Sequence, residues 1–422
     1  MARTYEVRDP VHNFILFQDF ERDLINSEPV QRLKRIKQLA MSYEIYPGAT
    51  HSRFEHSLGT MELATQAFNG ITRDQSEAYV RLGWTEPERQ SYRQLLRVGA
   101  LLHDVGHPPF SHAPEDLLPS DYKWHEHFTE AFIRSPYIQP LLNMGVATLN
   151  VDQVVAVALG QEKYPQEDPS IGLLQEIVAG ELGVDRMDYL VRDALHTGAT
   201  AGRFDYHRLL NTLTVIDHPI TGWPVLAIEA GGLHAAEGLI FARYFMFLQV
   251  YFHDTRRIYD RHLVDFLAGA LQGRRFPKEL DKYLEYTDDW VHSKIMEASG
   301  ADDQQGVLAK RLIGRNHFRK VLEVSGTDNV TFAQLAESIE AQFGDLIRID
   351  EAKKEAQSIE SERIYVVGDD GVPRDILEVS ELILTLRQMW RGRIYARRDV
   401  RAEVERACKQ FVQRTGGEEQ DE

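Results

Sequence analysis

Three histidines and an aspartate lie within the twelve residues LLHDVGHPPFSH, at positions 101–112. His103 and Asp104 directly follow the apolar run LLRVGALL, where packing side chains are expected. A buried aspartate is costly unless it meets a cation. Gly106 and the two prolines after it end the helix and allow the following side chains to fold back over the pair. The segment therefore predicts a buried polar site that holds a cation.

Two other segments supply further residues that could bind a metal. HSRFEHSLGTMELA at 51–64 places His51 and His56 at the head of an amphipathic helix, and VDRMDYLVRD occupies 184–193. Two imidazoles and two carboxylates from separate helices can converge on one divalent cation and leave positions open for water and substrate. A hydrolytic metal site requires such open positions. The spacing alone is weakly specific, because a lone histidine such as His56 is more often a hydrogen-bonded core residue.

Composition limits both the ligands and the partners. Cys408 is the single cysteine, which excludes an intrachain disulfide framework and a thiolate cage and leaves histidine and carboxylate as ligands. The net charge of -17 argues against a general binder of nucleic acid or anionic membranes. A local basic cluster in QRLKRIKQL could still bind a small anion, and a solvated helix face is the alternative. Its members are Arg32, Lys34, Arg35 and Lys37.

Length and composition describe a globular chain of one large domain or two ordinary ones. The 422 residues are 43% apolar and 27% charged, both close to average. Apolar stretches stay well short of the roughly 18 to 20 residues that span a bilayer, so no membrane contact is expected. The N-terminus MARTYEVRDPVHNF carries neither a signal-peptide core nor a cleavage site, which favours a cytoplasmic location.

Helical periodicity dominates the chain, and the sequence therefore predicts a mainly α protein. Apolar residues recur at spacings of three and four in six segments: 31–40, 61–71, 92–102, 127–135, 378–390 and 400–412. Short strands are expected at 363–368 and 393–396, which suggests a small mixed module near the C-terminus. Linkers or loops are expected at 298–306 and 351–362, and a frayed end at 416–422.

Four motifs together resemble those of a known family. PGATHSRFEHSLGTMELA, LLHDVGHPPFSH, KWHEH and VDRMDYLVRD, in this order, resemble the HD-domain phosphohydrolases, most closely the SAM-and-HD-domain dNTP triphosphohydrolases and their bacterial dGTPase-like relatives. The likeness begins near residue 7, is strong to about residue 210 and is thinner to about 260. It implies an HD-domain helical bundle with a small mixed α/β C-terminal module, and hydrolysis of dNTPs to deoxynucleoside and tripolyphosphate. The expected division is an HD phosphohydrolase domain at 1–270 and a helical and mixed α/β region at 271–422, without a SAM domain.

The resemblance also implies roles for individual residues. The metal ligands would be His56, His103, Asp104 and Asp185, around a divalent ion such as Mg, Mn, Fe, Zn, Co or Ni. The acid/base residues would be His112, Glu115 and His125. Chemically, a histidine that titrates near neutral pH can protonate the nucleoside leaving group while a carboxylate orients the ring. His107 either hydrogen-bonds the loop or supports the site from outside.

Substrate contacts follow from the same resemblance. Gln38 and Leu39 align with a pair beside the nucleobase, Arg53 and Arg186 with phosphate contacts, Tyr189 and Asp193 with residues that hold the sugar, and Arg243 and Tyr251 with a substrate helix. Relatives carry a lysine at the position of Arg186. The stretch FMFLQV between Arg243 and Tyr251 departs from the basic, histidine-containing stretch of the family. Because of this departure, the sequence does not show which residues would bind a triphosphate.

Three functions remain possible at this level. The first is a dNTP triphosphohydrolase, the second an HD phosphohydrolase that acts on another nucleotide or phosphorylated metabolite, and the third a regulatory or scaffold protein with a structural metal site. The acid/base candidates argue against the third, because a structural site does not need them. Relatives also suggest a nucleotide activator and a homo-oligomer, either a dimer or a tetramer.

Overall fold

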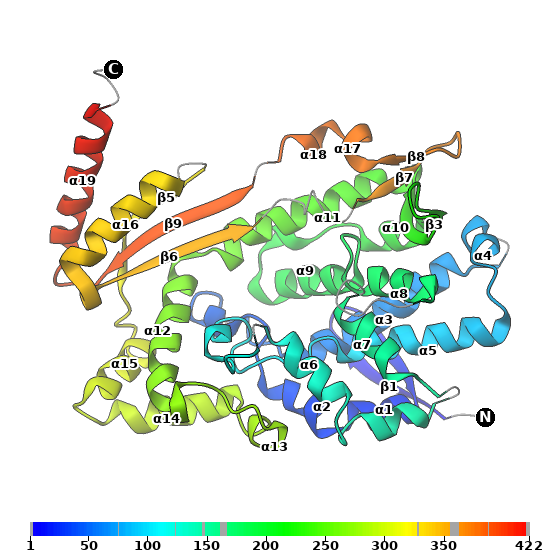
Figure 1. Ribbon diagram of the computed structural model, residues 1–422, viewed down its shortest axis with the longest axis horizontal. Helices are drawn as coiled ribbons and strands as arrows, with labels where there is room; N and C mark the ends of the chain where they lie inside the picture. The colour runs from blue at the N-terminus through cyan, green and yellow to red at the C-terminus, as the bar shows by residue number, and fades with distance from the viewer. Residues whose placement is uncertain are drawn as a thin grey trace.

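The structure is a computed structural model that describes residues 3–74, 76–122, 124–145, 148–160, 167–326, 329–354, 363–386 and 388–418. Figure 1 shows a helical body from the N-terminal hairpin to α15, with a three-stranded sheet and two helices at one end. The prediction of a mainly α chain with small mixed sheets towards the C-terminus is confirmed. In these described residues, no helix is both long and apolar enough to cross a membrane.

Three helices carry the HD motifs and pack on one another: α3 (Arg53–Ile71), α5 (Glu86–Leu102) and α9 (Val184–Thr197). Helix α3 begins with a capping box, in which the Ser52 backbone N–H donates to Glu55. Gly59 lies where α3 meets α9, and a Cβ there would come within 2.0 Å of the Asp188 carboxylate. Glycine at this position therefore allows the two helices to approach closely.

An antiparallel hairpin precedes the helical body. It consists of β1 (Thr4–Asp9) and β2 (Asn13–Gln18), with Thr4 opposite Gln18. Asp9 Oδ1 accepts the backbone N–H groups of Val11 and His12 at 2.9 Å each, and this fixes the turn. The turn places His12 against the buried face of α9. Sequence periodicity did not reveal this hairpin.

The other helices complete the body and one large core, which runs from Ile15 to Ile383. They are α1 (Asp19–Ile25), α2 (Glu28–Arg32), α4 (Glu77–Leu82), α6 (Glu126–Ile133), α7 (Val151–Leu159), α8 (Pro169–Ala179), α10 (Tyr206–Asn211), α11 (Leu233–Met246), α12 (Asp254–Ala270), α13 (Leu280–Tyr283), α14 (Asp288–Ser299) and α15 (Gln304–Ile313). Residues on both sides of position 270 contribute to this core. The domain boundary at 270/271 stays a prediction.

The later strands form two sheets. One has the order β3 (Leu213–Asp217), β4 (Pro224–Glu229), β7 (Tyr365–Val367) and β8 (Pro373–Asp375). The other places β9 (Met389–Ala396) between β5 (Arg319–Ser325) and β6 (Ile347–Lys354), with both pairs antiparallel. Helices α16 (Asn329–Phe343) and α19 (Arg401–Glu418) contact this sheet around a second, smaller core. Two short helices, α17 (Ile376–Val379) and α18 (Glu381–Leu384), follow β8 and precede β9 along the chain.

Two predicted helices were wrong. Residues 31–40 form the end of α2 and a 3-10 turn, after which Lys37 pairs with Ser52 in an isolated antiparallel bridge. The backbone hydrogen bonds from Gln38 to His51 and from Arg53 to Ile36 flank this bridge, and they replace helical ones. The described residues within 378–390 form the end of α17, the short α18 and the start of β9.

The remaining sequence predictions on secondary structure agree more closely. Four predicted helices overlap observed ones: 61–71 overlaps α3, 92–102 overlaps α5, 127–135 overlaps α6 and 400–412 overlaps α19. The predicted strand at 363–368 contains β7, and the one at 393–396 is the second half of β9. The loop at 298–306 is only a short turn between α14 and α15. In the segment 351–362, where a loop was expected, residues 351–354 belong to β6. Residues 355–362 lie outside the described residues. Helix α19 extends to Glu418, and the last four residues are likewise outside them.

Candidate active site

The four residues that the sequence assigned to a metal lie together where α3, α5 and α9 meet. His56 Nε2 is 3.0 Å from Asp185 Oδ1 and 3.5 Å from Asp104 Oδ2. His103 Nε2 is 3.5 Å from Asp104 Oδ1 and from Asp185 Oδ1. The ligand atoms of His56, His103 and Asp185 lie within 4.8 Å of one another, a separation that ligands around one divalent ion can have. These residues could therefore hold such an ion.

Outer hydrogen bonds fix which nitrogen of each imidazole faces the site. His56 Nδ1 lies 2.8 Å from Asp188 Oδ2, and His103 Nδ1 lies 2.7 Å from the Ala100 carbonyl. Each Nδ1–H can donate to its oxygen, which leaves Nε2 as a lone-pair donor. His103 Nε2 is buried and has no hydrogen-bond partner among the described residues. An unpartnered buried nitrogen fits a ligand to a cation.

Charge in this cluster also favours a cation. Burial raises the pKa values of Asp104 and Asp185, but Arg53 beside Asp104 and the two imidazoles beside Asp185 outweigh it and hold both below the usual range. Burial lowers the pKa of His56, but Asp185 and Asp188 raise it to about 10, so an ion that binds His56 Nε2 would replace a proton on that nitrogen. The carboxylates are thus ionised at neutral pH, and positive charge is drawn towards them.

Asp188 supports the ligand His56 and was missed by the sequence analysis. Its carboxylate also contacts His12 Nε2 at 2.6 Å and Arg192 Nε at 2.8 Å, and Arg192 in turn contacts Asp9 at 2.8 Å. This buried network ties the N-terminal hairpin to α9. The signal was the repeated Asp and Arg in VDRMDYLVRD, but only the fold shows which aspartate faces inward.

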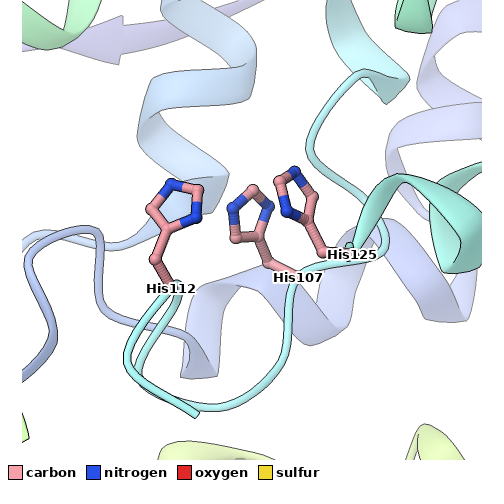
Figure 2. Close-up of side chains that lie close together, drawn as sticks. All are labelled: His107, His112 and His125. Carbon is pink, nitrogen blue, oxygen red and sulfur yellow. The ribbon is translucent and has the colours of Figure 1, made fainter. Parts of the chain in front are cut away.

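Three further histidines form a second cluster beside the first. Figure 2 shows His107, His112 and His125 side by side, on the loop after α5 and at the start of α6. The ring centroids of His107 and His125 are 3.5 Å apart, and those of His112 and His125 are 5.3 Å apart. His107 Nδ1 lies 3.2 Å from Asp104 Oδ1, which connects the two clusters.

Glu115 lies between two of these histidines. One oxygen accepts from His125 Nδ1 at 2.6 Å, and the other is 3.3 Å from His112 Nδ1. Burial raises the pKa of Glu115, but its histidine partners outweigh it and hold that carboxyl well below its usual range. Burial lowers the pKa of His125 and of His107, so both rings are neutral at neutral pH. His112 is the exposed member, with 58% of its side chain accessible. A carboxylate that orients an exposed imidazole is an acid/base arrangement.

Two distant residues shape the histidine loop. Arg32 is 1% exposed and donates to the carbonyl of His107 at 2.8 Å, so it is neither on a solvated face nor free for an anion. Asp288 accepts from the backbone N–H groups of Phe110, at 2.7 Å, and Lys37, at 2.9 Å. Burial raises the pKa of Asp288 to about 6. No local motif marked Asp288, because its role depends on contacts across the fold.

The two residues assigned to the sugar, Tyr189 and Asp193, form one group with Tyr251 of the substrate helix next to the metal cluster. Asp193 accepts from the Tyr251 hydroxyl at 2.7 Å and contacts His51 Nε2 at 2.8 Å. The Tyr189 ring lies 6.5 Å from that of His56 and 6.3 Å from that of Tyr251, between centroids. The fold therefore brings Tyr189 and Tyr251 together beside His56. Sequence motifs placed them 62 positions apart.

The two arginines assigned to phosphate and Arg243 of the substrate helix already have carboxylate partners. Arg53 pairs with Asp104 and donates to Ser111 Oγ at 2.8 Å. Arg186 and Arg243 both contact Glu181, at 2.6 and 3.0 Å. Sequence reasoning missed Glu181, which stands in a short segment without a motif.

Gln38 and Leu39 differ from each other in their surroundings. Leu39 is 6% exposed and belongs to the large hydrophobic core. The Gln38 backbone N–H donates to the His51 carbonyl at 3.1 Å, and its side-chain oxygen is buried without a hydrogen-bond partner among the described residues. Their role beside a nucleobase stays a prediction.

Comparison with known proteins identifies the family. Residues 53–139 match the HD domain, and residues 204–421 match the HD associated region. The chain belongs to this HD-domain family. It is thus an HD-domain phosphohydrolase, and its His and Asp clusters are consistent with a divalent metal.

Relatives of the HD-domain family show what this chain is similar to. An uncharacterized protein of Methanocaldococcus jannaschii is 32% identical over 92% of this chain and 78% of its own length. A Dictyostelium discoideum protein named a deoxynucleoside triphosphate triphosphohydrolase SAMHD1 homolog is 27% identical over 93% of this chain and 77% of its own length. The chain spans only 55% of an uncharacterized Bacillus subtilis relative that is 34% identical. A crystal structure of a hypothetical protein from Aquifex aeolicus superposes with a TM-score of 0.79 over 96% of this chain and 100% of its own, at 31% identity.

Proposed function

We propose that this HD-domain phosphohydrolase is a metal-dependent deoxynucleoside triphosphate triphosphohydrolase. It would hydrolyse a dNTP at the α-phosphate and release deoxynucleoside and tripolyphosphate. The observation that carries the proposal is the shared location of three groups: the His/Asp cluster, the Glu115–histidine group and the aromatic wall at Tyr189. The Dictyostelium relative is named for this activity, which supports it further.

Each residue then has a chemical task. His56, His103, Asp104 and Asp185 would hold the divalent ion, which when bound polarises the α-phosphate and activates water. His112 would protonate the 5′ oxygen as it leaves, and Glu115 would orient the imidazole and stabilise its charged form. His125 braces Glu115 from the buried side.

The remaining residues would bind the substrate. Tyr189 would pack against C2′ of the sugar, where a ribose hydroxyl would clash, and Asp193 would accept a hydrogen bond from the sugar. Arg53, Arg186 and Arg243 would face the phosphates, with Tyr251 beside them. Gln38 and Leu39 would lie near the base. A nucleotide activator and a homo-oligomer, as dimer or tetramer, remain part of this proposal.

A second candidate is an HD phosphohydrolase that acts on another nucleotide or phosphorylated metabolite. It is favoured by the arginine pairing, because Arg53, Arg186 and Arg243 all have carboxylate partners. Such a site offers less net positive charge to a triphosphate than three unpaired arginines would.

Product analysis distinguishes the two candidates. Metal-loaded protein is incubated with each dNTP and NTP, alone and in pairs, and the phosphorus products are identified by 31P NMR. Tripolyphosphate with free deoxynucleoside is the expected result. Orthophosphate or pyrophosphate alone would replace the first candidate with the second, and stimulation seen only in the paired reactions would support a nucleotide activator.

A further inference from the structure

A single carboxylate bridges the two arginines that α9 and α11 contribute to the proposed phosphate site. Glu181 Oε2 lies 2.6 Å from Arg186 and 3.0 Å from Arg243, with each distance measured to the guanidinium nitrogen NH1. Glu181 is almost completely buried, with 3% of its side chain exposed, and Arg243 is nearly as buried at 8%. The carboxylate is therefore a fixed anion between the two cations.

The bridge lies next to the residue that would face the sugar. Arg186 and Tyr189 stand three positions apart on α9 and therefore lie on the same side of this helix. Burial raises the pKa of Tyr189, and the guanidinium groups of Arg243 and Arg186 both oppose this rise. A polyphosphate chain that starts at the His/Asp cluster and contacts these arginines must also approach Glu181. Its negative charge would then be repelled by the carboxylate while it competes for the Arg243 N–H group that donates to Glu181.

The chain around Glu181 is closely packed. Residues 180–183 form a tight connection between α8 and α9, in which a Cβ on Gly180 would lie 2.5 Å from the Glu176 carbonyl. A Cβ on Gly183 would lie 2.6 Å from the Val178 carbonyl. Neither glycine has room for a side chain, so the connection that carries Glu181 is compact.

We propose that Glu181 is a specificity-determining residue that weakens binding of a polyphosphate chain relative to a single phosphate. It does so as an internal anion that shares Arg186 and Arg243 with the ligand. This inference rests on the proposed function for the assignment of both arginines to phosphate. In a triphosphohydrolase, Glu181 raises the KM for dNTP and speeds release of tripolyphosphate.

Binding of inorganic anions tests the inference without catalysis. The probes are orthophosphate and tripolyphosphate, added to metal-loaded protein with excess magnesium and followed by isothermal titration calorimetry. Wild-type protein is expected to bind tripolyphosphate within about tenfold of orthophosphate. Glu181→Gln keeps the shape and removes the charge, and it is expected to bind tripolyphosphate at least about tenfold tighter, with orthophosphate nearly unchanged.

Two matched variants sharpen the test. Glu237→Gln on α11 removes the same charge at a buried carboxylate that contacts Ser380 and His234 instead of an arginine, so its tripolyphosphate affinity should match the wild type. Glu181→Asp keeps the negative charge and should also bind like the wild type. Unchanged tripolyphosphate affinity in Glu181→Gln, or an equal gain in Glu237→Gln, would overturn the inference.

If Glu181→Gln does not fold, the affinities of the wild-type protein for the two anions still test the inference. Tripolyphosphate binding more than about 100-fold tighter than orthophosphate would contradict an internal anion. Failure of the proposed function gives a different pattern: no dNTP hydrolysis, but tighter tripolyphosphate binding in Glu181→Gln. Hydrolysis of dNTP to tripolyphosphate, with no effect of Glu181→Gln on binding, would leave the proposed function and remove this inference.

Discussion

At the scale of residues, three of the four assigned metal ligands have a second contact that orients them. His56 is oriented by Asp188, His103 by the Ala100 carbonyl, and Asp104 by Arg53. Preorganised ligands lose little conformational entropy when they bind an ion, and loss of one ligand removes much of the affinity.

We expect His103→Ala to remove bound metal and hydrolytic activity together. The helical circular dichroism signal should stay close to the wild type, because the large core does not depend on one side chain. Metal content is measured by inductively coupled plasma mass spectrometry. His127→Ala is the control, since His127 is half-buried and contacts the Trp124 carbonyl and the Tyr122 ring instead of the assigned metal ligands. Wild-type metal content in His103→Ala would refute the ligand assignment.

His112→Ala tests the acid/base assignment. Turnover should fall by about 100-fold or more with KM little changed, which is the scale for loss of a positioned proton donor. Steady-state kinetics with a dNTP provide both constants. A rise in KM alone would make His112 a binding residue and leave His125 as the next candidate for the proton donor.

Tyr189→Ala tests discrimination at the sugar. Removal of the ring should narrow the ratio of dNTP to NTP turnover, even if both rates fall, because the barrier at C2′ is lost. The ratio is measured with one base in both sugar forms. Tyr189 could instead be only a packing residue beside Tyr251, in which case thermal stability and both activities would fall in proportion. An unchanged ratio in a folded, metal-loaded variant would rule out the steric barrier.

At the scale of elements, the site depends on how closely α3 and α9 approach. Asp188 and Arg192 of α9 face Gly59 of α3, and the same Asp188 orients the ligand His56. A change in this helix contact would therefore displace a metal ligand as well as reduce stability.

Gly59→Ala should destabilise the protein despite the higher helix propensity of alanine. The added Cβ would lie 2.0 Å from Asp188 Oδ1, and the expected cost is about 1 to 3 kcal/mol, measured by urea unfolding. Gly238→Ala on α11 is the matched control, because its Cβ would meet only Phe204 Cβ at 3.5 Å. That variant should gain up to about 1 kcal/mol from propensity. Equal effects in both variants would show that the α3–α9 contact is not tight.

At the scale of the whole molecule, a buried charge connects the helical body to the C-terminal sheet. Asp350 on β6 contacts Arg257 at 2.6 Å and Arg261 at 3.2 Å, both on α12. Figure 1 shows α12 between the helical body and the three-stranded sheet. Burial raises the pKa of Asp350, but the arginines, above all Arg257, outweigh it and lower that pKa.

The lowered pKa predicts how stability changes with pH. A carboxylate whose pKa is lower in the folded state adds stability that is complete above its unfolded pKa of about 4 and is lost as pH falls further. The free energy of unfolding should therefore decline below about pH 4, measured by urea unfolding at several pH values. Asp350→Asn should cost about 3 to 5 kcal/mol at pH 7 and make this decline shallower. An equally steep decline in the variant would show that other carboxylates control it.

The sequence by itself determined the helical class and the chemical character of the site. Apolar residues at spacings of three and four marked α3, α5, α6 and α19, because helix formation depends on local periodicity. The H, HD, D order and the VDRMDYLVRD motif also stand in the sequence, so the residue types indicate a site that could bind a metal. The resemblance to the HD-domain phosphohydrolases added the individual ligands and the acid/base residues.

Only the tertiary structure decided which residues support and limit that site. Strands β1, β2 and the first half of β9 were missed because a strand depends on its pairing partner. Residues 31–40 do not form one helix, because Lys37 pairs with Ser52 instead. Asp288 and Glu181 carry no local pattern. Asp288 acts through backbone groups 178 and 251 positions away, and Glu181 pairs with an arginine 62 positions away. Such contacts follow from the packing of α3, α9, α11 and α14, which no short stretch of sequence encodes.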